Sequence, residues 1–176
     1  MSFNEKGYLV IRNLISEEEI QKLNTHLNNR DDANLTCSQA IGTPSLYGDE
    51  EMKKTQIKLL PKIEEYSGLK LFKTYSFARI YKKGDILRIH TDRVACEISV
   101  TLDLGGDKWP IWLLDKDENP IEIHLNPGDA LIYKGIVNKH WRGKFNGNKH
   151  TQIFIHYVDK FGPYYWAKDD IFKEKP

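Results

Sequence analysis

Hydrophobic and polar residues follow two different periods along the chain, and the change falls near Lys70. Residues 7–14 form a short apolar run that is typical of a strand. Over 17–29, apolar residues recur at helical spacing after Ser16 and a run of glutamates, which predicts a helix with Ser16 as its N-cap. The same spacing over 52–66 predicts a second helix. The first part of the chain is therefore expected to be mainly helical.

The second predicted helix contains a proline, Pro61. Because proline has no N–H to donate and clashes with the preceding turn, we expect Pro61 to kink or split this helix. Ile57, Leu60 and Ile63 lie on one of its faces. Residues 30–49, between the two helices, are rich in Asn, Asp, Ser, Gly and Pro and predict a long loop.

From Lys70 onward, short β-rich runs are separated by turn-forming residues. The predicted strands are 71–80, 85–90, 97–104, 111–114, 121–125, 130–134, 140–145 and 151–158. Short strands in this number after two helices predict an α+β, mainly β, fold: a jelly-roll or cupin-like barrel of two sheets, with the N-terminal helices packed outside. We expect a single domain over 1–176, with a helical part over 1–69 and a barrel core over 70–160.

Composition and charge narrow the class of protein. The chain has 176 residues, a formal net charge of +1 and two cysteines, Cys37 and Cys96. The near-neutral charge gives no basic footprint for nucleic acid, and two cysteines are too few for a disulfide framework. The sequence shows no secretory signal and no apolar run long enough to cross a bilayer. We therefore expect a cytoplasmic protein with reduced cysteines and with no nucleic-acid or membrane partner; the oligomeric state stays open.

One short motif has the chemistry of a metal site. His90-Thr91-Asp92 ends a predicted strand, where residues two apart share a face, and His140 begins another predicted strand. Two histidines and one carboxylate on one side of an ion leave its other side open, which is the facial triad of non-haem iron(II) oxygenases. The H-x-D motif alone is weak, and a strand-end histidine bonded to a local acceptor is the alternative interpretation.

Further segments surround these residues: 79–85 precedes His90, 126–133 precedes His140-Trp141-Arg142, and 152–157 follows. In this order and spacing they resemble the catalytic core of the iron(II)/2-oxoglutarate-dependent dioxygenase superfamily. The branch they resemble most contains the prolyl hydroxylases and many small bacterial and phage oxygenases. The resemblance covers nearly the whole chain. It implies a double-stranded β-helix with Fe(II) at one mouth, held by His90, Asp92 and His140.

The resemblance also implies an activity. The protein would be an oxidoreductase with 2-oxoglutarate as co-substrate, O2 as oxidant and ascorbate as a candidate reductant. Related halogenases lack the metal-binding carboxylate, so the presence of Asp92 implies hydroxylation. The first expectation for the substrate is a prolyl or other peptidyl residue, and an oxygenase acting on a small molecule is the alternative.

The far carboxylate of 2-oxoglutarate needs a buried cation, because an unpaired charge in a barrel interior is very costly. Many members of the superfamily place an Arg or Lys about ten residues after the distal histidine. This chain has Lys149 and His150 there instead. If His140 points into the barrel, strand alternation turns Arg142 inward too, whereas an inward His150 turns Lys149 outward. We therefore favour Arg142 as the anchor, with Lys149 as the second candidate.

Other residues are candidates for the same pocket. Tyr81 resembles in type and spacing a tyrosine that holds the co-substrate in prolyl hydroxylases. Ser99 and Thr101 share one face of their strand and could add hydroxyl groups. Arg79 could bind 2-oxoglutarate or an anionic group of the substrate. His156 is expected to be a core histidine rather than a ligand.

Aromatic residues are expected to frame the mouth of the site together with the 30–49 loop: Tyr47, Trp109, Trp112 and residues 164–166. Three rival functions remain. A non-catalytic cupin-like binding module would explain the barrel but not an inward Arg142. A zinc hydrolase would need a general base, for which Glu97 is the near candidate. A nucleic-acid demethylase would need a basic stripe that the sequence lacks.

Overall fold

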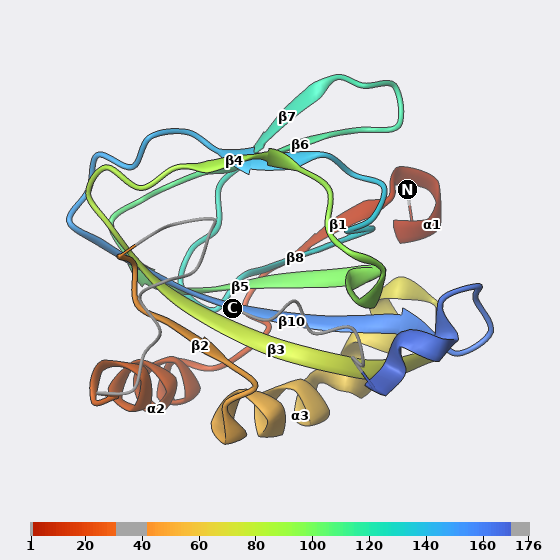
Figure 1. Cartoon of the computed structure of the whole chain (residues 1–176), viewed down its shortest axis with the longest axis horizontal. Coiled ribbons are helices and arrows are strands. Elements are labelled where there is room, and N and C mark those ends of the chain that lie inside the picture. Colours follow the sequence, from red (N-terminus) through yellow and green to blue (C-terminus); the bar gives the residue numbers. More distant parts are fainter. Residues whose placement is uncertain (1, 31–41, 170–176) are drawn as a thin grey trace.

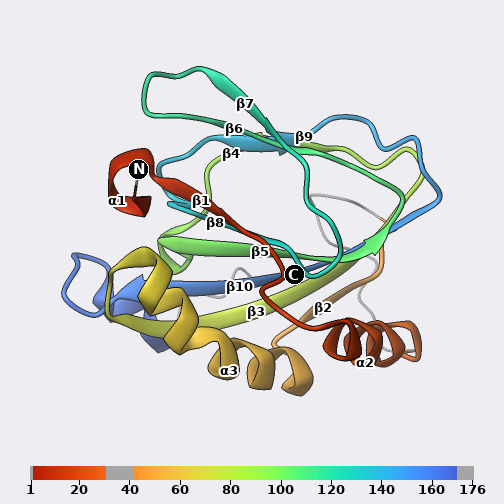
Figure 2. The ribbon, with the colours of Figure 1, turned by 180° about the vertical axis from the view of Figure 1, so that it is seen from behind.

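The computed structural model describes residues 2–30 and 42–169, which form two facing antiparallel β-sheets with helices on one outer side (Figure 1). Residues 31–41 of the predicted loop, with Cys37, lie outside the described residues. The layers run from helices, through the larger sheet, to the smaller sheet, and Figure 2 shows the same order from behind. This arrangement confirms the predicted mainly β barrel of two sheets.

The larger sheet has six strands in the order β1-β8-β5-β10-β3-β2. Its long central strands are β5 (Ile98–Gly106), β10 (Lys149–Asp159) and β3 (Leu71–Lys82), and its shorter strands are β1 (Tyr8–Ile11), β8 (Ala130–Tyr133) and β2 (Ser45–Tyr47). Strand β2 lies inside the stretch predicted as a loop, because its backbone pairs with β3 although its sequence has no clear alternation.

The smaller sheet has four strands in the order β4-β9-β6-β7. They are β4 (Leu87–His90), β9 (His140–Arg142), β6 (Ile111–Leu114) and β7 (Pro120–Ile123). In the β4–β9 pair, His90 lies opposite His140 and Leu87 lies opposite Arg142. The space between the two sheets therefore receives side chains from β9 on one side and from β10, β5 and β3 on the other.

Helices α2 (Glu17–Asn28) and α3 (Glu50–Ser67) cover the outer face of the larger sheet (Figures 1 and 2). The main hydrophobic core fills this interface with alternate residues of the central strands, among them Val100, Leu102, Ile153 and Ile155. The remaining helical elements are short: α1 (Phe3–Lys6), η1 (Val94–Cys96) and η2 (Tyr165–Asp169). None of the helices among the described residues is long and apolar enough to cross a membrane.

The N-terminus of α2 follows the sequence prediction. The Ser16 hydroxyl accepts a hydrogen bond from the Glu19 N–H, and the Glu19 carboxylate accepts one from the Ser16 N–H. This reciprocal capping box satisfies two backbone donors that the first turn cannot pair within the helix.

Helix α3 is continuous through Pro61, so the expected split is wrong. Proline removes the hydrogen bond to the carbonyl of Ile57, four residues earlier. Both residues are exposed, so water can solvate that carbonyl. The buried face is built on Met52, Leu59 and Ile63, while Ile57 is 54% exposed.

The burial of α3 makes a stability prediction. Leu59→Ala removes a side chain that is 2% exposed in the main core, so we expect a loss of about 2–4 kcal/mol in the free energy of unfolding. Ile57→Ala is the matched control on the same helix, with an expected change below about 0.5 kcal/mol. Urea denaturation measures both variants. Equal losses would contradict the packing of α3 on the sheet.

Candidate active site

The structure brings His90, Asp92 and His140 together between the two sheets. His90 ends β4, His140 begins β9 opposite it, and Asp92 follows β4. The Oδ1 atom of Asp92 is 3.5 Å from Nε2 of His90 and 3.5 Å from Nε2 of His140. The ring centroids of the histidines are 4.3 Å apart. Three potential ligand atoms therefore face one point.

Both imidazole rings are oriented by backbone carbonyls. Nδ1 of His90 is 2.7 Å from the Arg88 carbonyl oxygen, and Nδ1 of His140 is 2.9 Å from that of Asn138. A carbonyl only accepts hydrogen bonds, so each Nδ1 carries the proton and donates it. Nε2 of each ring is then directed at the shared point, where it can hydrogen-bond to Asp92 or bind a metal ion.

Asp92 is ionised in this arrangement. Burial raises the pKa of its carboxyl, but hydrogen bonds from the His140 and His90 rings, together with charge from His140, outweigh burial and hold the pKa well below its usual range. Its Oδ2 atom accepts a hydrogen bond from the Ser99 hydroxyl at 2.7 Å, and its N–H donates to the Gly135 carbonyl at 2.8 Å. Two imidazole nitrogens and one carboxylate oxygen are a donor set that suits a divalent transition metal with an open face.

A second group of potential ligands, Asp92, Cys96 and His156, fits a metal less well. Burial raises the pKa of the Cys96 thiol far above its usual range, whereas metal binding needs a thiolate. The Cys96 sulfur is 3.0 Å from the Tyr75 hydroxyl, and the Ser99 hydroxyl lies between Asp92 and His156. Hydrogen bonds already use these atoms.

Arg142 of β9 is 1% exposed, and its guanidinium lies inside the barrel. Its Nη1 donates to the Trp109 carbonyl, and its guanidinium carbon is 5.1 Å from the Trp109 ring. Within the described residues its Nε and Nη2 are buried without a hydrogen-bond partner. Burial lowers the pKa of Arg142, and nearby Tyr81 and Asp103 counter that effect. Two adjacent unsatisfied donors on a buried cation match the two oxygens of a ligand carboxylate.

Lys149 lies elsewhere. It begins β10, its side chain is exposed, and its amino group donates to Asn28 of α2. This placement outside the barrel agrees with the alternation that turns Lys149 outward and does not support it as an anchor.

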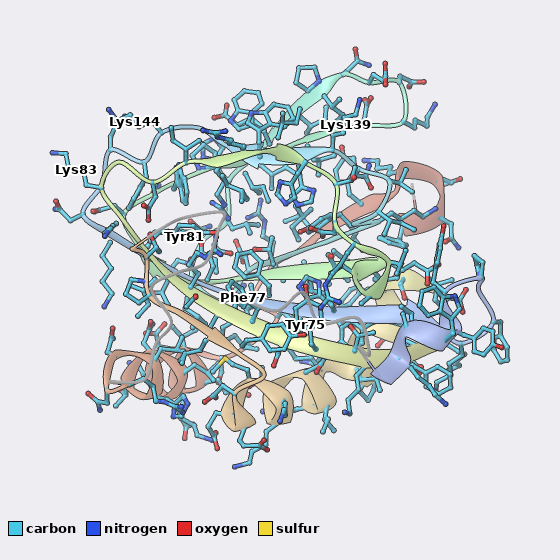
Figure 3. The ribbon with its side chains drawn as sticks, in the orientation of Figure 1. Tyr75, Phe77, Tyr81, Lys83, Lys139 and Lys144 are labelled. Carbon is cyan, nitrogen blue, oxygen red and sulfur yellow. The ribbon has the colours of Figure 1, made fainter. Side chains whose placement is uncertain are left out.

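The remaining predicted residues divide into two groups. Tyr81 and Arg79 are each 1% exposed, and the Arg79 guanidinium carbon is 5.4 Å from the Tyr81 ring. Figure 3 shows Tyr81 in the space between the sheets, whereas Lys83 and Lys144 project outward at one end. The second group is Ser99 and Thr101, whose hydroxyls already have partners within the protein. Ser99 donates to Asp92, and Thr101 donates to the Gln152 amide oxygen at 2.5 Å.

Sequence reasoning missed Tyr133 and Asp103. The Tyr133 hydroxyl is 3.4 Å from Nε2 of His140, and burial raises its pKa, so it stays a neutral donor. Asp103 is 4% exposed, and burial raises its pKa to about 6. Strand alternation was the signal for Asp103, which shares parity with Ser99 and Thr101. Tyr133 lies opposite Ser99 through the pairing of β8 with β5, which the sequence alone does not show.

Buried hydrogen bonds connect His150 and Gln152 beside Asp103. The His150 Nδ1 proton is donated to the Asp107 carbonyl at 3.0 Å, and its Nε2 accepts from the Gln152 amide at 2.8 Å. Burial lowers the pKa of His150 to about 3, so its ring is neutral. His150 and Gln152 therefore bond to each other, to Asp107 and to Thr101, and they do not pair with Nε or Nη2 of Arg142.

The expected rim aromatics are dispersed. Trp109 is buried beside Arg142, and Trp112 stacks on Trp141 at 6.0 Å on the outer face of the smaller sheet. These two do not frame the mouth. Tyr47 is 45% exposed and stacks on Tyr75 at 4.9 Å, next to Arg93.

No family model and no curated sequence matches the chain. Solved structures do. A Pseudomonas putida prolyl-4-hydroxylase aligns with a TM-score of 0.75 at 14% identity, over 89% of this chain and 95% of that one. The epimerase SnoN, in complex with Fe3+, alpha ketoglutarate and nogalamycin RO, aligns with a TM-score of 0.76 at 9% identity, over 99% of this chain and 89% of that one. The chain has the double-stranded β-helix fold of the 2-oxoglutarate/iron(II) oxygenases.

HygX from Streptomyces hygroscopicus, with nickel and 2-oxoglutarate bound, shares this oxygenase fold with a TM-score of 0.71 at 12% identity, over 90% of this chain and 85% of that one. The predicted fold class is therefore confirmed. At these identities the likeness shows the fold, and the chemistry of the site has to be argued from this chain's own residues.

Gly135 is packed against the Asp92 carboxylate, which makes it a sensitive position. A Cβ at 135 would lie 2.5 Å from Asp92 Oδ2 and 2.3 Å from the Cys96 carbonyl oxygen. We expect Gly135→Ala to cost about 1–3 kcal/mol of stability and to displace the carboxylate. At Gly143 a Cβ would meet nothing within 4 Å, so Gly143→Ala is the matched control. Urea unfolding and Co(II) titration measure both, and equal behaviour would contradict the packing.

The raised pKa of Asp103, about 6, predicts a pH-dependent contribution to stability. An aspartate in the unfolded chain titrates near pH ~4, so the folded state binds more protons between about pH 4 and 6. The contribution, up to about 3 kcal/mol, is present below this window and is lost as pH rises through it.

The Asp103→Asn variant has an uncharged side chain at this position at every pH in this range, and it keeps an oxygen that accepts from the Gly105 N–H. We expect its free energy of unfolding, relative to the parent protein, to increase as the pH is raised from about 4 to 7. Denaturant titrations across this range measure the difference. A difference that stays constant with pH would contradict the burial of an Asp103 charge.

Proposed function

We propose that this protein is an Fe(II)- and 2-oxoglutarate-dependent dioxygenase that hydroxylates its substrate. The observation that carries the proposal is the pairing of two features in one barrel interior. The His90, Asp92 and His140 ligand atoms face one point, and Arg142 presents two buried, unsatisfied donors. A divalent iron and a dicarboxylate are the two ligands that these features match.

His90, Asp92 and His140 hold the metal in this proposal, and the hydrogen bonds at Nδ1 leave Nε2 of each ring to bind it. With Fe(II), 2-oxoglutarate and O2 bound, the site would convert a substrate C–H bond to C–OH while the co-substrate is decarboxylated to succinate and CO2.

Arg142 would pair with the far carboxylate of 2-oxoglutarate through Nε and Nη2. Tyr81, Trp109 and Phe145 form an apolar cluster that excludes water there and so strengthens the ion pair. Tyr133, a neutral hydroxyl next to His140, is a further donor between the metal site and Arg142.

The substrate class rests on likeness alone. The prolyl-4-hydroxylase neighbour supports a prolyl or other peptidyl residue as the first candidate. A small-molecule substrate is the second, because the SnoN and HygX structures contain nogalamycin RO and hygromycin B.

A zinc hydrolase is less well supported. Glu97, the one nearby general base suggested by the sequence, accepts a hydrogen bond from the Asp159 N–H at 2.8 Å. Its carboxylate is tied to the end of β10 and not to the metal ligands.

The test is anaerobic addition of Fe(II) and 2-oxoglutarate, with detection of the visible charge-transfer band of the chelate. We expect a band in the parent protein and none in Asp92→Ala. Arg142→Ala should weaken 2-oxoglutarate binding about 10- to 100-fold, since a charge-assisted bidentate pair is lost, and Arg142→Lys should restore part of it.

Two surface variants complete the design. Lys144→Ala, at an exposed site two positions beyond Arg142, is the matched control and should bind as the parent does. Lys149→Ala tests the second candidate anchor. No band in folded parent protein would refute the oxygenase proposal, and a loss confined to Lys149→Ala would move the anchor.

A further inference from the structure

We propose that Ser99 and His156 are positioning residues that hold Asp92 as a ligand through one oxygen only. The proposal rests on the oxygenase function above. It assigns Ser99 to the metal ligand rather than to the co-substrate, and it gives His156 a role beyond the core.

Three contacts carry the argument. Ser99 of β5 is fully buried, and its hydroxyl oxygen is 2.7 Å from Oδ2 of Asp92. The same oxygen is 3.0 Å from Nδ1 of His156 on the neighbouring strand β10. Oδ1, the other carboxylate oxygen, faces both histidines at 3.5 Å. One oxygen of Asp92 is therefore held by the protein and the other is presented to the metal point.

The direction of these hydrogen bonds follows from the donors. An ionised Asp92 only accepts, so the single Ser99 hydrogen is directed at Oδ2, its shortest contact. The Cys96 carbonyl, 3.2 Å from the Ser99 oxygen, can only accept and receives at most a share of that hydrogen. The Ser99 oxygen then has a lone pair for His156, which must donate from Nδ1. The order is His156 to Ser99 to Asp92.

Other groups pack against both sides of the hydrogen-bonded series of His156, Ser99 and Asp92. The Tyr75 ring lies 4.5 Å from the His156 ring, and the Tyr75 hydroxyl contacts the Cys96 sulfur at 3.0 Å. Gly135 packs where any side chain would enter the Ser99–Asp92 hydrogen bond, since a Cβ there would be 2.5 Å from the Ser99 oxygen. The carboxylate therefore cannot rotate without breaking a buried bond.

The hydrogen bond to Oδ2 of Asp92 limits how this carboxylate can coordinate a metal ion. Fe(II) with this donor set needs open positions for both chelating oxygens of 2-oxoglutarate and for O2. If the Asp92 carboxylate rotated and bound through both of its oxygens, it would occupy one of these open positions. Ser99 occupies Oδ2 and so keeps the face opposite the triad open.

The experiment measures Co(II) affinity and the number of waters on bound Mn(II), which water-proton relaxation reports. We expect Ser99→Ala to bind Co(II) about 10- to 100-fold more weakly than the parent, the usual effect of losing a hydrogen bond behind a metal ligand. It should also retain fewer waters on Mn(II), because the released carboxylate can use both oxygens. Ser76→Ala, which removes another buried serine hydroxyl from the helix-covered side of β3, is the matched control and should change neither value.

His156 provides an independent test. His156→Leu removes the donor to Ser99 and should weaken Co(II) binding, whereas His156→Asn keeps an N–H near the Nδ1 position and should restore most of it. Parent-like affinity and water number in folded Ser99→Ala would overturn the proposal. Equal losses of Co(II) affinity in His156→Leu and His156→Asn would also overturn it. This comparison decides the matter if Ser99→Ala fails to fold. Failure of the parent to bind Co(II) would instead refute the proposed function.

Discussion

The antiparallel pairing of β4 with β9 is the constraint on which the candidate site depends. Its register places His90 opposite His140 and Leu87 opposite Arg142. Side chains alternate along a strand, so His140 and Arg142 both enter the barrel from β9 while Trp141 lies outside. A slip of one residue would turn both inward groups to solvent and bury a tryptophan in their place. Two of the proposed metal ligands and the proposed co-substrate anchor therefore share one structural cause.

The larger sheet separates two kinds of core. Its outer face packs aliphatic residues against α2 and α3, while its inner face carries polar groups such as Ser99, Thr101 and Gln152. Buried polar groups destabilise a fold unless they are paired, and here hydrogen bonds between neighbouring strands pair them. Arg142 keeps two adjacent donors, Nε and Nη2, without a partner among the described residues, and a ligand carboxylate could satisfy both.

Features governed by local periodicity could be predicted from the sequence. Strand alternation gave the inward direction of Arg142 from His140, and it gave the outward direction of Lys149. What failed depends on tertiary context. Helix α3 continues through Pro61 because exposure allows water to replace the lost hydrogen bond, and periodicity alone did not show that Leu59 would be buried. Alternation also placed Ser99 inside the barrel, but its partner, Asp92, depends on how residues 94–96 fold back between them.

Hydrogen bonds within the fold position each of the proposed metal ligands. Their three potential ligand atoms lie within 4.8 Å of one another and face a common point, so a cation bound there would contact all three. The fold maintains this arrangement through bonds behind each ligand: backbone carbonyls for His90 and His140, and the Ser99 hydroxyl for Asp92. Since the unfolded chain has no such arrangement, a metal that binds there stabilises the folded state by mass action. The residues behind the proposed ligands, Ser99 among them, would therefore serve both the coordination of the metal and the stability of the metal-bound fold.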